Sequence, residues 1–260
     1  MIGAPSDRDR PLAIVTGGAR GIGLATVQAL ASLGFYVVAV DAPRTSSMPY
    51  PLSSLHDLEG IKGEHIQPEP CDVRDSAQLS ALVERLVSTF GPVQVVVACA
   101  GVLAGSASSL ELDPEQAHEI FAVDYWGVVH LAMATMPSLR TTQGVFIAIT
   151  SAAGLRGLPQ LGHYCGAKHA VHGFLAALAR EELPNGVHIN MVAPGSTDTA
   201  LLQATAAVYN LASPTAFLAQ QLEPTLNTPD DIASVVAFLA THPTSGINAA
   251  TIAVDRGFLG

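Results

Sequence analysis

Tyr164 and Lys168 lie four positions apart in a chain that contains only two lysines among its 260 residues. On a helix, residues i and i+4 share a face, so the lysine ammonium would lie beside the tyrosine phenol. A neighbouring positive charge favours the phenolate and lowers the phenol pKa, which would make Tyr164 an acid or base usable near neutral pH. The alternative is an exposed tyrosine and a solvated lysine on a surface helix.

Ser151 is a second side chain suited to this chemistry. It stands thirteen positions before Tyr164, directly after an apolar run that predicts a strand. Ligands of open α/β sheets bind at the carboxyl ends of the strands, so the Ser151 hydroxyl could hold a substrate oxygen while Tyr164 transfers the proton. Taken alone, a serine after a strand is usually a turn residue.

A glycine-rich segment, TGGARGIG at residues 16–23, separates a predicted strand from a predicted helix. Its glycines allow a tight turn and bring a phosphate close to the backbone, and the helix N-terminus favours negative charge. The spacing differs from GxGxxG, and an ordinary strand-to-helix turn is the alternative. The residues of this segment predicted to bind a dinucleotide are Gly17, Arg20, Gly21, Ile22 and Gly23.

Asp41 ends the second predicted strand, about 20 residues after the turn, where a carboxylate accepts hydrogen bonds from the adenosine ribose of NAD. The same carboxylate repels the 2′-phosphate of NADP. Arg20 and Arg44 are counter-signals, because a guanidinium could attract that phosphate. Asp72 follows the third predicted strand, where it could bond the adenine amino group or cap the helix that begins near Ser76. We give Asp41 more weight and expect NAD as the cofactor.

Short apolar runs alternate with longer helical patterns along the chain, which is typical of a parallel sheet covered on both faces. We predict an α/β fold, a doubly wound parallel sheet of about seven strands in one domain (11–260) after a flexible tail (1–10). The predicted strands are 12–16, 36–40, 65–67, 93–98, 144–150, 187–192 and 249–254. The predicted helices are 22–33, 76–90, 114–136, 162–183 and 230–240. A proline- and serine-rich loop follows at 42–51, and the apolar segment 196–224 has no clear role in the sheet.

Composition limits the possible partners. Hydrophobic residues make up 49% of the chain and charged residues 13%, and the formal net charge of −10 argues against nucleic acid. The three cysteines (Cys71, Cys99, Cys165) and the histidines around Tyr164 lack the spacing of metal ligands, so no metal is expected. The chain shows neither a secretory signal nor a membrane-spanning run. We therefore expect a soluble, cytoplasmic protein with a small-molecule substrate.

In order and spacing, these motifs resemble the short-chain dehydrogenase/reductase family in its single-domain, Rossmann-type form. The resemblance covers nearly the whole chain and implies NAD(P)-dependent oxidation of alcohols or reduction of ketones. The matching segments are TGGARGIG at 16–23, Asp41, CDV at 71–73, ACAG at 98–101, Ser151, YCGAK at 164–168, PGSTDT at 194–199 and AVDRG at 253–257.

The resemblance implies a role for each matched residue. Tyr164 would donate and accept the proton, Lys168 would hold the nicotinamide ribose and lower the tyrosine pKa, and Ser151 would bind the substrate oxygen. The other implied cofactor contacts are Asp72 and Val73 near the adenine, Ala100 and Gly101 at a close backbone approach, Val192 near the nicotinamide ribose, and Pro194, Gly195, Thr197 and Thr199 at the nicotinamide end.

Two departures from the family pattern affect the catalytic centre. Ala98 and Cys99 replace the first two asparagines of the family's NNAG. Asp124 stands at the position of the family's helix asparagine, which supports a water bridging to the lysine, largely through its main chain. An aspartate would keep that arrangement, or its carboxylate would pair with Lys168 and shift the protonation of Tyr164. We count Asp124 among the catalytic candidates and expect activity to be retained.

Between Asp41 and Asp72 the chain is longer than the usual family form, with MPYPLSSLHDL at 48–58. Together with LRGLPQLGHY at 155–164 and the segment 198–209, this insertion is similar to that of the mycofactocin-associated dehydrogenases. Those proteins are similar to carveol dehydrogenases and hold NAD tightly beneath the extra segment, which implies an external redox acceptor as a partner. A tolerated surface-loop insertion is the alternative.

The apolar segment at about 196–226 corresponds to the family's substrate lid and favours a hydrophobic secondary alcohol over a polyol or phosphorylated sugar. Leu103, Leu155 and Leu158 are expected in the same pocket. Packing of these side chains against a neighbouring subunit is the alternative. By resemblance, helices 114–136 and 162–183 form a dimer interface, and the C-terminal strand doubles the dimer to a homotetramer.

The leading interpretation is an NAD-dependent dehydrogenase for hydrophobic secondary alcohols. One alternative is an NADPH-dependent ketone or 3-oxoacyl reductase, which Asp41 disfavours. The other is a catalytically weak, NAD-binding regulatory protein, motivated by the ACAG segment and Asp124. The serine, tyrosine and lysine described above oppose it, because a pure binding module does not require them.

Overall fold

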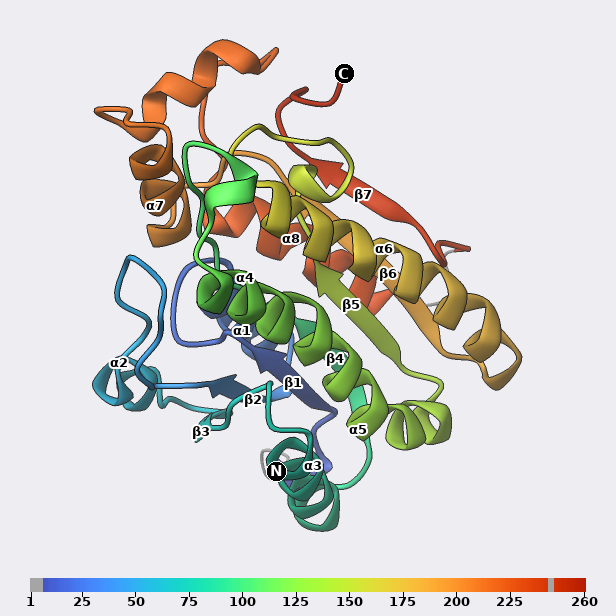
Figure 1. Ribbon diagram of the computed structural model, residues 1–260. Coiled ribbons are helices and arrows are strands. Elements are labelled where there is room, and N and C mark those ends of the chain that lie inside the picture. Colours follow the sequence, from blue (N-terminus) through green and yellow to red (C-terminus); the bar gives the residue numbers. More distant parts are fainter. Residues whose placement is uncertain (1–6, 243–245) are drawn as a thin grey trace.

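The computed structural model describes residues 7–242 and 246–260, and in it seven parallel strands form one sheet in the order β3-β2-β1-β4-β5-β6-β7 (Figure 1). The chain builds the sheet outward from β1 to β3, returns to place β4 beside β1, and continues to β7. This confirms the predicted doubly wound sheet. The strands are β1 (Leu12–Thr16), β2 (Tyr36–Asp41), β3 (Ile66–Pro70), β4 (Val93–Ala98), β5 (Val145–Ile149), β6 (His188–Pro194) and β7 (Thr251–Val254).

Helices cover both faces of the sheet, which is why its central strands are apolar on both sides. In β1, Leu12 and Ile14 join the core beneath α3, α5 and α6, whereas Ala13 and Val15 join the core beneath α1 and α8. No helix in the described part of the chain is both long and apolar enough to cross a membrane. The helices are α1 (Gly21–Ser32), α2 (Leu55–Gly60), α3 (Ser76–Phe90), α4 (Pro114–Phe121), α5 (Gly127–Thr142), α6 (Gly162–Glu182), α7 (Ala200–Val208) and α8 (Pro229–Thr241).

The predicted helix 114–136 differs from the structure in two ways. A π-helical turn, Ala122–Trp126, separates α4 from α5, and α5 continues past Pro137 to Thr142. The extension is favourable because Leu139, beyond the proline, is fully buried against the sheet core. The π turn has a consequence for the site, because it carries Asp124.

The structure adds detail in three further segments. Helix α2 was not predicted, although Ser54 and Asp57 form a capping box at its start. The segment 196–224 contains α7 and a 3₁₀ segment, Pro214–Gln220. Of the predicted tail, residues 1–6 lie outside the described residues, and Asp7–Asp9 form a 3₁₀ turn before β1.

Candidate active site

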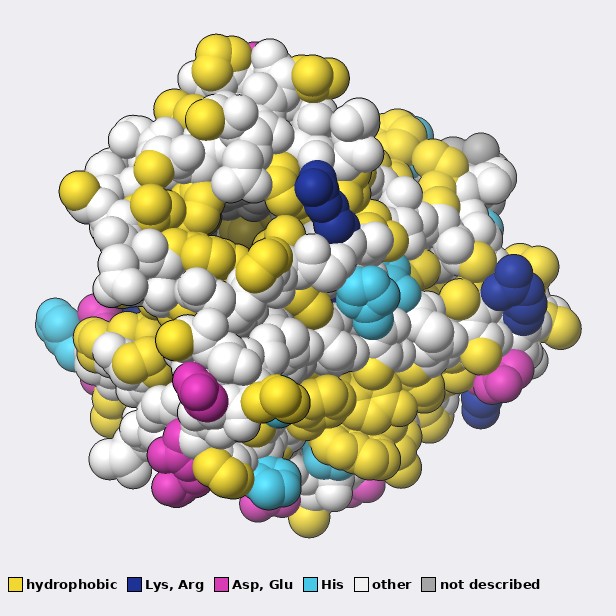
Figure 2. Space-filling model, turned by 45° about the horizontal axis from the view of Figure 1, so that its top comes forward, with side chains coloured by type: hydrophobic (Ala, Val, Ile, Leu, Met, Phe, Trp, Pro, Cys, Tyr) yellow, Lys and Arg dark blue, Asp and Glu magenta, His cyan; other side chains and the backbone are white. Residues whose placement is uncertain are grey.

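A cavity of about 940 Å³ lies at the carboxyl ends of the strands, where the strand order reverses between β1 and β4. Figure 2 shows a hollow bordered by hydrophobic side chains on the face that carries α7. Of the predicted site residues, the cavity brings together Gly17, Arg20, Gly21, Ile22, Gly23, Asp41, Asp72, Val73, Ala100, Gly101, Ser151, Tyr164, Lys168, Pro194, Gly195, Thr197 and Thr199. Asp124 and Val192 are the exceptions, because neither lines the cavity and neither has exposed surface: Asp124 lies behind the cavity wall, and Val192 packs in the core beneath α1 and α8.

The glycine turn crosses closely over the chain that follows β4. Gly17 has a φ of +68°, and a Cβ added there would lie 2.8 Å from the Ala100 Cα. Thr16 supports this crossing from below, because its Oγ1 accepts hydrogen bonds from the amides of Cys99 (3.1 Å) and Ala100 (3.3 Å). No side chain caps the N-terminus of α1, so its amides are available to a pyrophosphate at the cavity.

Asp41 ends β2 inside the cavity, and the chain itself orients its carboxylate. Oδ2 accepts a hydrogen bond from the Ala19 amide (3.0 Å), and Oδ1 accepts from the Ala42 amide (2.8 Å) and the Ser53 hydroxyl (2.9 Å). A negative group thus stands beside the turn where an adenosine ribose would bind.

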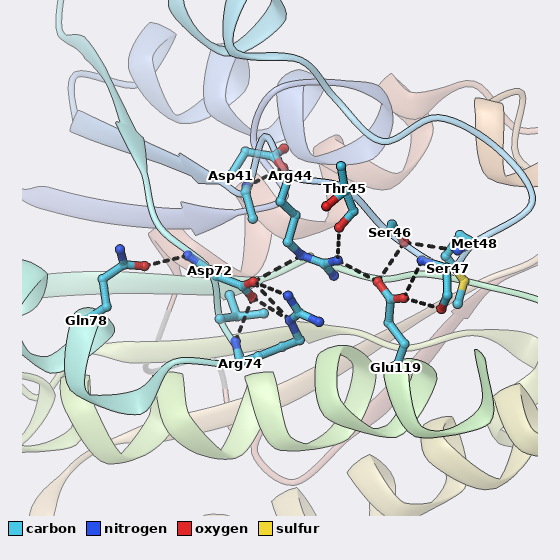
Figure 3. Close-up of polar contacts among 12 residues, drawn as sticks. Asp41, Arg44, Thr45, Ser46, Ser47, Met48, Asp72, Arg74, Gln78 and Glu119 are labelled. Carbon is cyan, nitrogen blue, oxygen red and sulfur yellow. Dashed lines mark hydrogen bonds and ion pairs between the residues drawn. The ribbon is translucent and has the colours of Figure 1, made fainter. Parts of the chain in front are cut away.

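Next to Asp41, Arg44 lies between two carboxylates (Figure 3). Its Nε is 3.0 Å from Asp72 Oδ2 and its Nη1 is 2.7 Å from Glu119 Oε1. Burial would raise the pKa of Glu119, but hydrogen bonds from Ser46 and Ser47, together with Arg44, lower it to about 2. The counter-signal from Arg44 is therefore compensated within the chain.

Asp72 does not cap α3, since that role belongs to Asp75, whose carboxylate accepts from the Ala77 and Gln78 amides. Asp72 instead binds Arg74, with Nη2 2.7 Å from its Oδ2. Burial would raise the pKa of Asp72, but the Arg74 hydrogen bonds lower it below its usual range. Asp72 is thus an ionised, half-buried group at the adenosine end of the cavity.

Tyr164, Lys168 and Ser151 meet at the opposite end of the cavity. Tyr164 is in the first turn of α6 and is 6% exposed, Lys168 is 4% exposed, and its Nζ lies 5.6 Å from the centre of the tyrosine ring. The Lys168 Nζ donates to the Ile149 carbonyl at 3.5 Å, and Ser151 begins the 3₁₀ turn after β5. The end of β5 and helix α6 therefore place a phenol, a hydroxyl and an ammonium close together.

The expectation that Lys168 lowers the pKa of Tyr164 is not met. Burial raises the pKa of this phenol above its ordinary value, and the negative charge of Asp124 raises it further. A hydrogen bond with Ser151 acts in the opposite direction but only partly offsets the two. Sequence spacing identified the neighbouring cation but could not show how deeply the phenol is buried.

Asp124 reaches the site from the π turn through Lys168. Its Oδ1 accepts a hydrogen bond from the Val102 amide at 2.8 Å. Its Oδ2 lies 3.9 Å from the Lys168 Nζ and has no hydrogen-bond partner. Burial raises the pKa of Asp124 to about 6, although Lys168 and the Val102 amide act to lower it.

The cavity beyond Tyr164 is mainly apolar. Leu103 and Leu158 line it as expected, but Leu155 points to solvent, at 43% exposure, and is outside it. The Tyr209 hydroxyl, at the end of α7, donates to the Pro159 carbonyl at 2.6 Å and joins the predicted lid to the loop before α6. The lid residues that line the cavity are 196–200 together with Leu201, Leu202, Thr205, Tyr209, Leu211, Phe217 and Gln220.

Sequence reasoning missed the polar contacts that tie the insertion to the site. Tyr50 reaches the end of β4, where its hydroxyl accepts a hydrogen bond from the Leu103 amide at 2.8 Å. Pro51 accepts from Arg20 Nη1 at 3.1 Å, and Ser53 bonds Asp41 as described. Glu119, whose contacts are described above, did have a sequence signal. It stands beside Ile120, on the apolar side of α4, where a carboxylate needs a buried partner.

The histidines on α6 were not expected to bind a metal, and they make other contacts. His169 Nδ1 is 2.8 Å from the Cys165 carbonyl, and His172 Nδ1 is 3.2 Å from the Thr251 hydroxyl. Within residues 7–242 and 246–260, no three histidine, cysteine or acidic side chains gather as metal ligands would.

Comparison with known proteins gives matches over nearly the full chain. A family model described as enoyl-(acyl carrier protein) reductase matches residues 17–259. An uncharacterized NAD-dependent oxidoreductase of Mycobacterium tuberculosis is 33% identical over 263 residues, covering 95% of this chain and 95% of that protein. The (-)-trans-carveol dehydrogenase of Rhodococcus erythropolis is 30% identical over 266 residues, covering 95% and 96%. The crystal structure of carveol dehydrogenase from Mycobacterium avium in complex with NAD is similar, with a TM-score of 0.89 at 25% identity over 96% of this chain and 97% of that one.

Proposed function

Since the chain belongs to the short-chain dehydrogenase/reductase family, we propose that it is an NAD-dependent dehydrogenase that interconverts a hydrophobic secondary alcohol and its ketone. The observation that carries the proposal is the position of Ser151, Tyr164 and Lys168, between the dinucleotide half of the cavity and its apolar half. The names of the carveol dehydrogenases support the substrate class.

The cofactor is NAD. Asp41 presents an oriented carboxylate where NADP would place its 2′-phosphate. Of the relatives described above, the Mycobacterium tuberculosis oxidoreductase is named as NAD-dependent, and the Mycobacterium avium carveol dehydrogenase was solved with NAD. Residues of the glycine turn would hold the pyrophosphate, and Asp41 the adenosine ribose. When bound, NAD would supply the hydride acceptor.

Three side chains would carry the proton chemistry. Ser151 would bind the substrate oxygen, and Tyr164 would take the proton of the alcohol as the carbon–hydrogen bond gives up its hydride. Lys168, buried beside the phenol, would hold the ribose of the cofactor, and its positive charge would oppose the influences that raise the pKa of Tyr164. The products of oxidation are then a ketone, a reduced nicotinamide and a protonated Tyr164, and reduction follows the same steps in reverse.

We also propose that the insertion restrains NAD. The segment 48–54 contacts the glycine turn through Arg20, the end of β2 through Asp41 and the end of β4 through Leu103. A segment attached at these three points limits the routes by which a dinucleotide leaves. The similarity of the insertion to that of the mycofactocin-associated dehydrogenases, which hold NAD tightly, also supports such a restraint.

The test is nicotinamide reduction on a panel of hydrophobic secondary alcohols, with NAD or NADP added to the purified protein. We expect turnover with NAD alone, and a loss of about 10²- to 10⁴-fold in Tyr164→Phe with NAD binding retained. One equivalent reduced, followed by a stall that an artificial electron acceptor relieves, would support dehydrogenation with held NAD. NAD binding without any reduction would contradict the proposal and favour a regulatory protein, and turnover with NADPH alone would favour the reductase alternative.

A further inference from the structure

Arg44 is a cation at the adenosine end of the cavity, which it lines together with Asp41 and Asp72. The forked guanidinium of arginine suits phosphate groups better than any other side chain. An uncompensated Arg44 so close to Asp41 would attract the 2′-phosphate of NADP. Its ion pairs with Asp72 and Glu119 therefore bear on which dinucleotide the chain accepts (Figure 3).

The charged side chains around Arg44 form two ion pairs. These pairs indicate which carboxylate neutralises the Arg44 guanidinium. Asp72 is held on both oxygens by Arg74, whose Nε is 3.1 Å from Oδ1 and 2.9 Å from Oδ2. Arg74 thus already balances Asp72. The remaining negative charge within contact of Arg44 is that of Glu119, at 2.7 Å.

Glu119 is built into this position from both sides. It is 7% exposed and projects from α4, and it accepts hydrogen bonds from Ser46 Oγ (2.6 Å), the Ser47 amide (2.9 Å) and Ser47 Oγ (2.5 Å). The same two serines follow Arg44 in the chain, so Glu119 fixes the guanidinium and the backbone that carries it. An anion at this distance competes directly with a phosphate for the same donors.

We propose that Glu119 is a specificity-determining residue that disfavours NADP by holding and neutralising Arg44. The chain then discriminates against the 2′-phosphate twice, through repulsion by Asp41 and through the occupied donors of Arg44. Replacing Asp41 alone is therefore not sufficient to admit NADP. The inference rests on dinucleotide binding and not on alcohol oxidation, so a protein inactive toward every alcohol would still test it.

The experiment measures the dissociation constants of NADP and NAD by calorimetry in an Asp41→Ser background. Asp41→Ser/Glu119→Gln is expected to bind NADP about tenfold more tightly than Asp41→Ser, because one charge-assisted contact with the phosphate becomes available. NAD lacks the phosphate, so its affinity should change less than about threefold. Glutamine is chosen because its carbonyl oxygen can still accept hydrogen bonds from the serines.

Two variants in the same background separate this contact from general effects. Asp41→Ser/Glu115→Gln removes an equal charge from the exposed side of α4 and should leave NADP affinity unchanged. Asp41→Ser/Arg44→Gln/Glu119→Gln replaces the ion pair by a neutral pair and should bind NADP as Asp41→Ser does. Thermal unfolding of each variant reports whether it is folded.

Three results would overturn the proposal. Equal gains from Glu115→Gln and Glu119→Gln would mean that only the net charge matters. An NADP affinity unaffected by Glu119→Gln in a folded protein would mean that Arg44 does not reach the phosphate. Weaker NADP binding in the neutral-pair variant than in Asp41→Ser would mean that Arg44 already contacts the phosphate while paired with Glu119, and this variant decides the matter if Glu119→Gln alone does not fold.

Discussion

At the scale of single residues, Asp124 is the group whose charge has the widest influence on the site. Its unpaired Oδ2 faces Lys168, and its negative charge is the largest influence after burial on the raised pKa of Tyr164. An asparagine of the same shape could keep the hydrogen bond from the Val102 amide without that charge. The carboxylate therefore tunes Tyr164 from behind the cavity wall.

Asp124→Asn should lower the pKa of Tyr164 and shift the pH dependence of alcohol oxidation. Oxidation requires the deprotonated phenol, so kcat/KM should begin to rise at a lower pH, by about 0.5 to 1 unit, in the variant. The measurement is kcat/KM with a reactive alcohol from pH 6 to 10, with Glu115→Gln as the control. An unchanged profile would show that the side-chain charge is irrelevant to catalysis.

Asp124→Asn should also change how the unfolding free energy depends on pH, in a direction that the raised Asp124 pKa determines. Burial raises the Asp124 pKa from 3.8 to about 6, so between these values the native state binds the proton more tightly than the unfolded chain. The carboxylate thus destabilises the fold as pH rises through this window, and the penalty is absent below it. Asp124→Asn should match the original protein at pH 4 and exceed it in unfolding free energy by about 2–3 kcal/mol at pH 8. A gain of equal size at both pH values would contradict this account.

At the scale of elements, several strands and helices were predictable from the sequence where their apolar periodicity decides them. β1, α3 and β4 begin and end where their apolar periodicity predicts. The π turn and the extension of α5 past Pro137 were not predictable, because burial against the sheet stabilises them and overrides the local preference. Helix α2 had a local signal in its capping box, and this signal was overlooked within the insertion.

The Tyr50 hydroxyl is one of the three contacts that tie the insertion to the site. Tyr50→Phe leaves the Leu103 amide without its acceptor, which should lower the unfolding free energy by about 1–3 kcal/mol. If the insertion restrains NAD, the same change should also speed NAD release, measured by dilution of the loaded protein into a trap. Tyr36→Phe, which loses a hydrogen bond to Gln67 outside the cavity, should destabilise the fold without faster release. Equal release rates in the two variants would separate the insertion from cofactor retention.

At the scale of the whole molecule, the site is assembled by topology from residues far apart in the chain. The sheet brings the segments after β1, β2, β4, β5 and β6 to one edge, so motifs in the right order already predict which residues meet. What the order could not predict is the pairing of charges behind them. Glu119 compensates Arg44 from α4, and Asp124 faces Lys168 from the π turn, because both contacts depend on how the helices pack.

The helices that hold these charges also present an apolar outer face. Trp126, the last residue of the π turn, and Met133, on α5, are 51% and 68% exposed, and a spacing of seven along continuous helical backbone places them on one side. Figure 2 shows a broad apolar field over the region of α5 and α6. Apolar patches of this kind mark interaction surfaces, in keeping with the predicted dimer interface of a homotetramer.

Charging this face should therefore change the assembly and leave the fold intact. Trp126→Glu/Met133→Glu should reduce a tetramer to dimers held through the C-terminal strand, because two buried carboxylates would lie without partners at a subunit interface. Leu33→Glu, which charges an exposed leucine (50%) at the end of α1, should leave the tetramer unchanged. Light scattering coupled to size-exclusion chromatography measures the mass, and circular dichroism checks the fold. Helix α5 continues from the π turn that carries Asp124, and Asp124 faces Lys168. A tetramer that persists in the double variant would therefore mean that the subunit contacts lie away from this part of the chain.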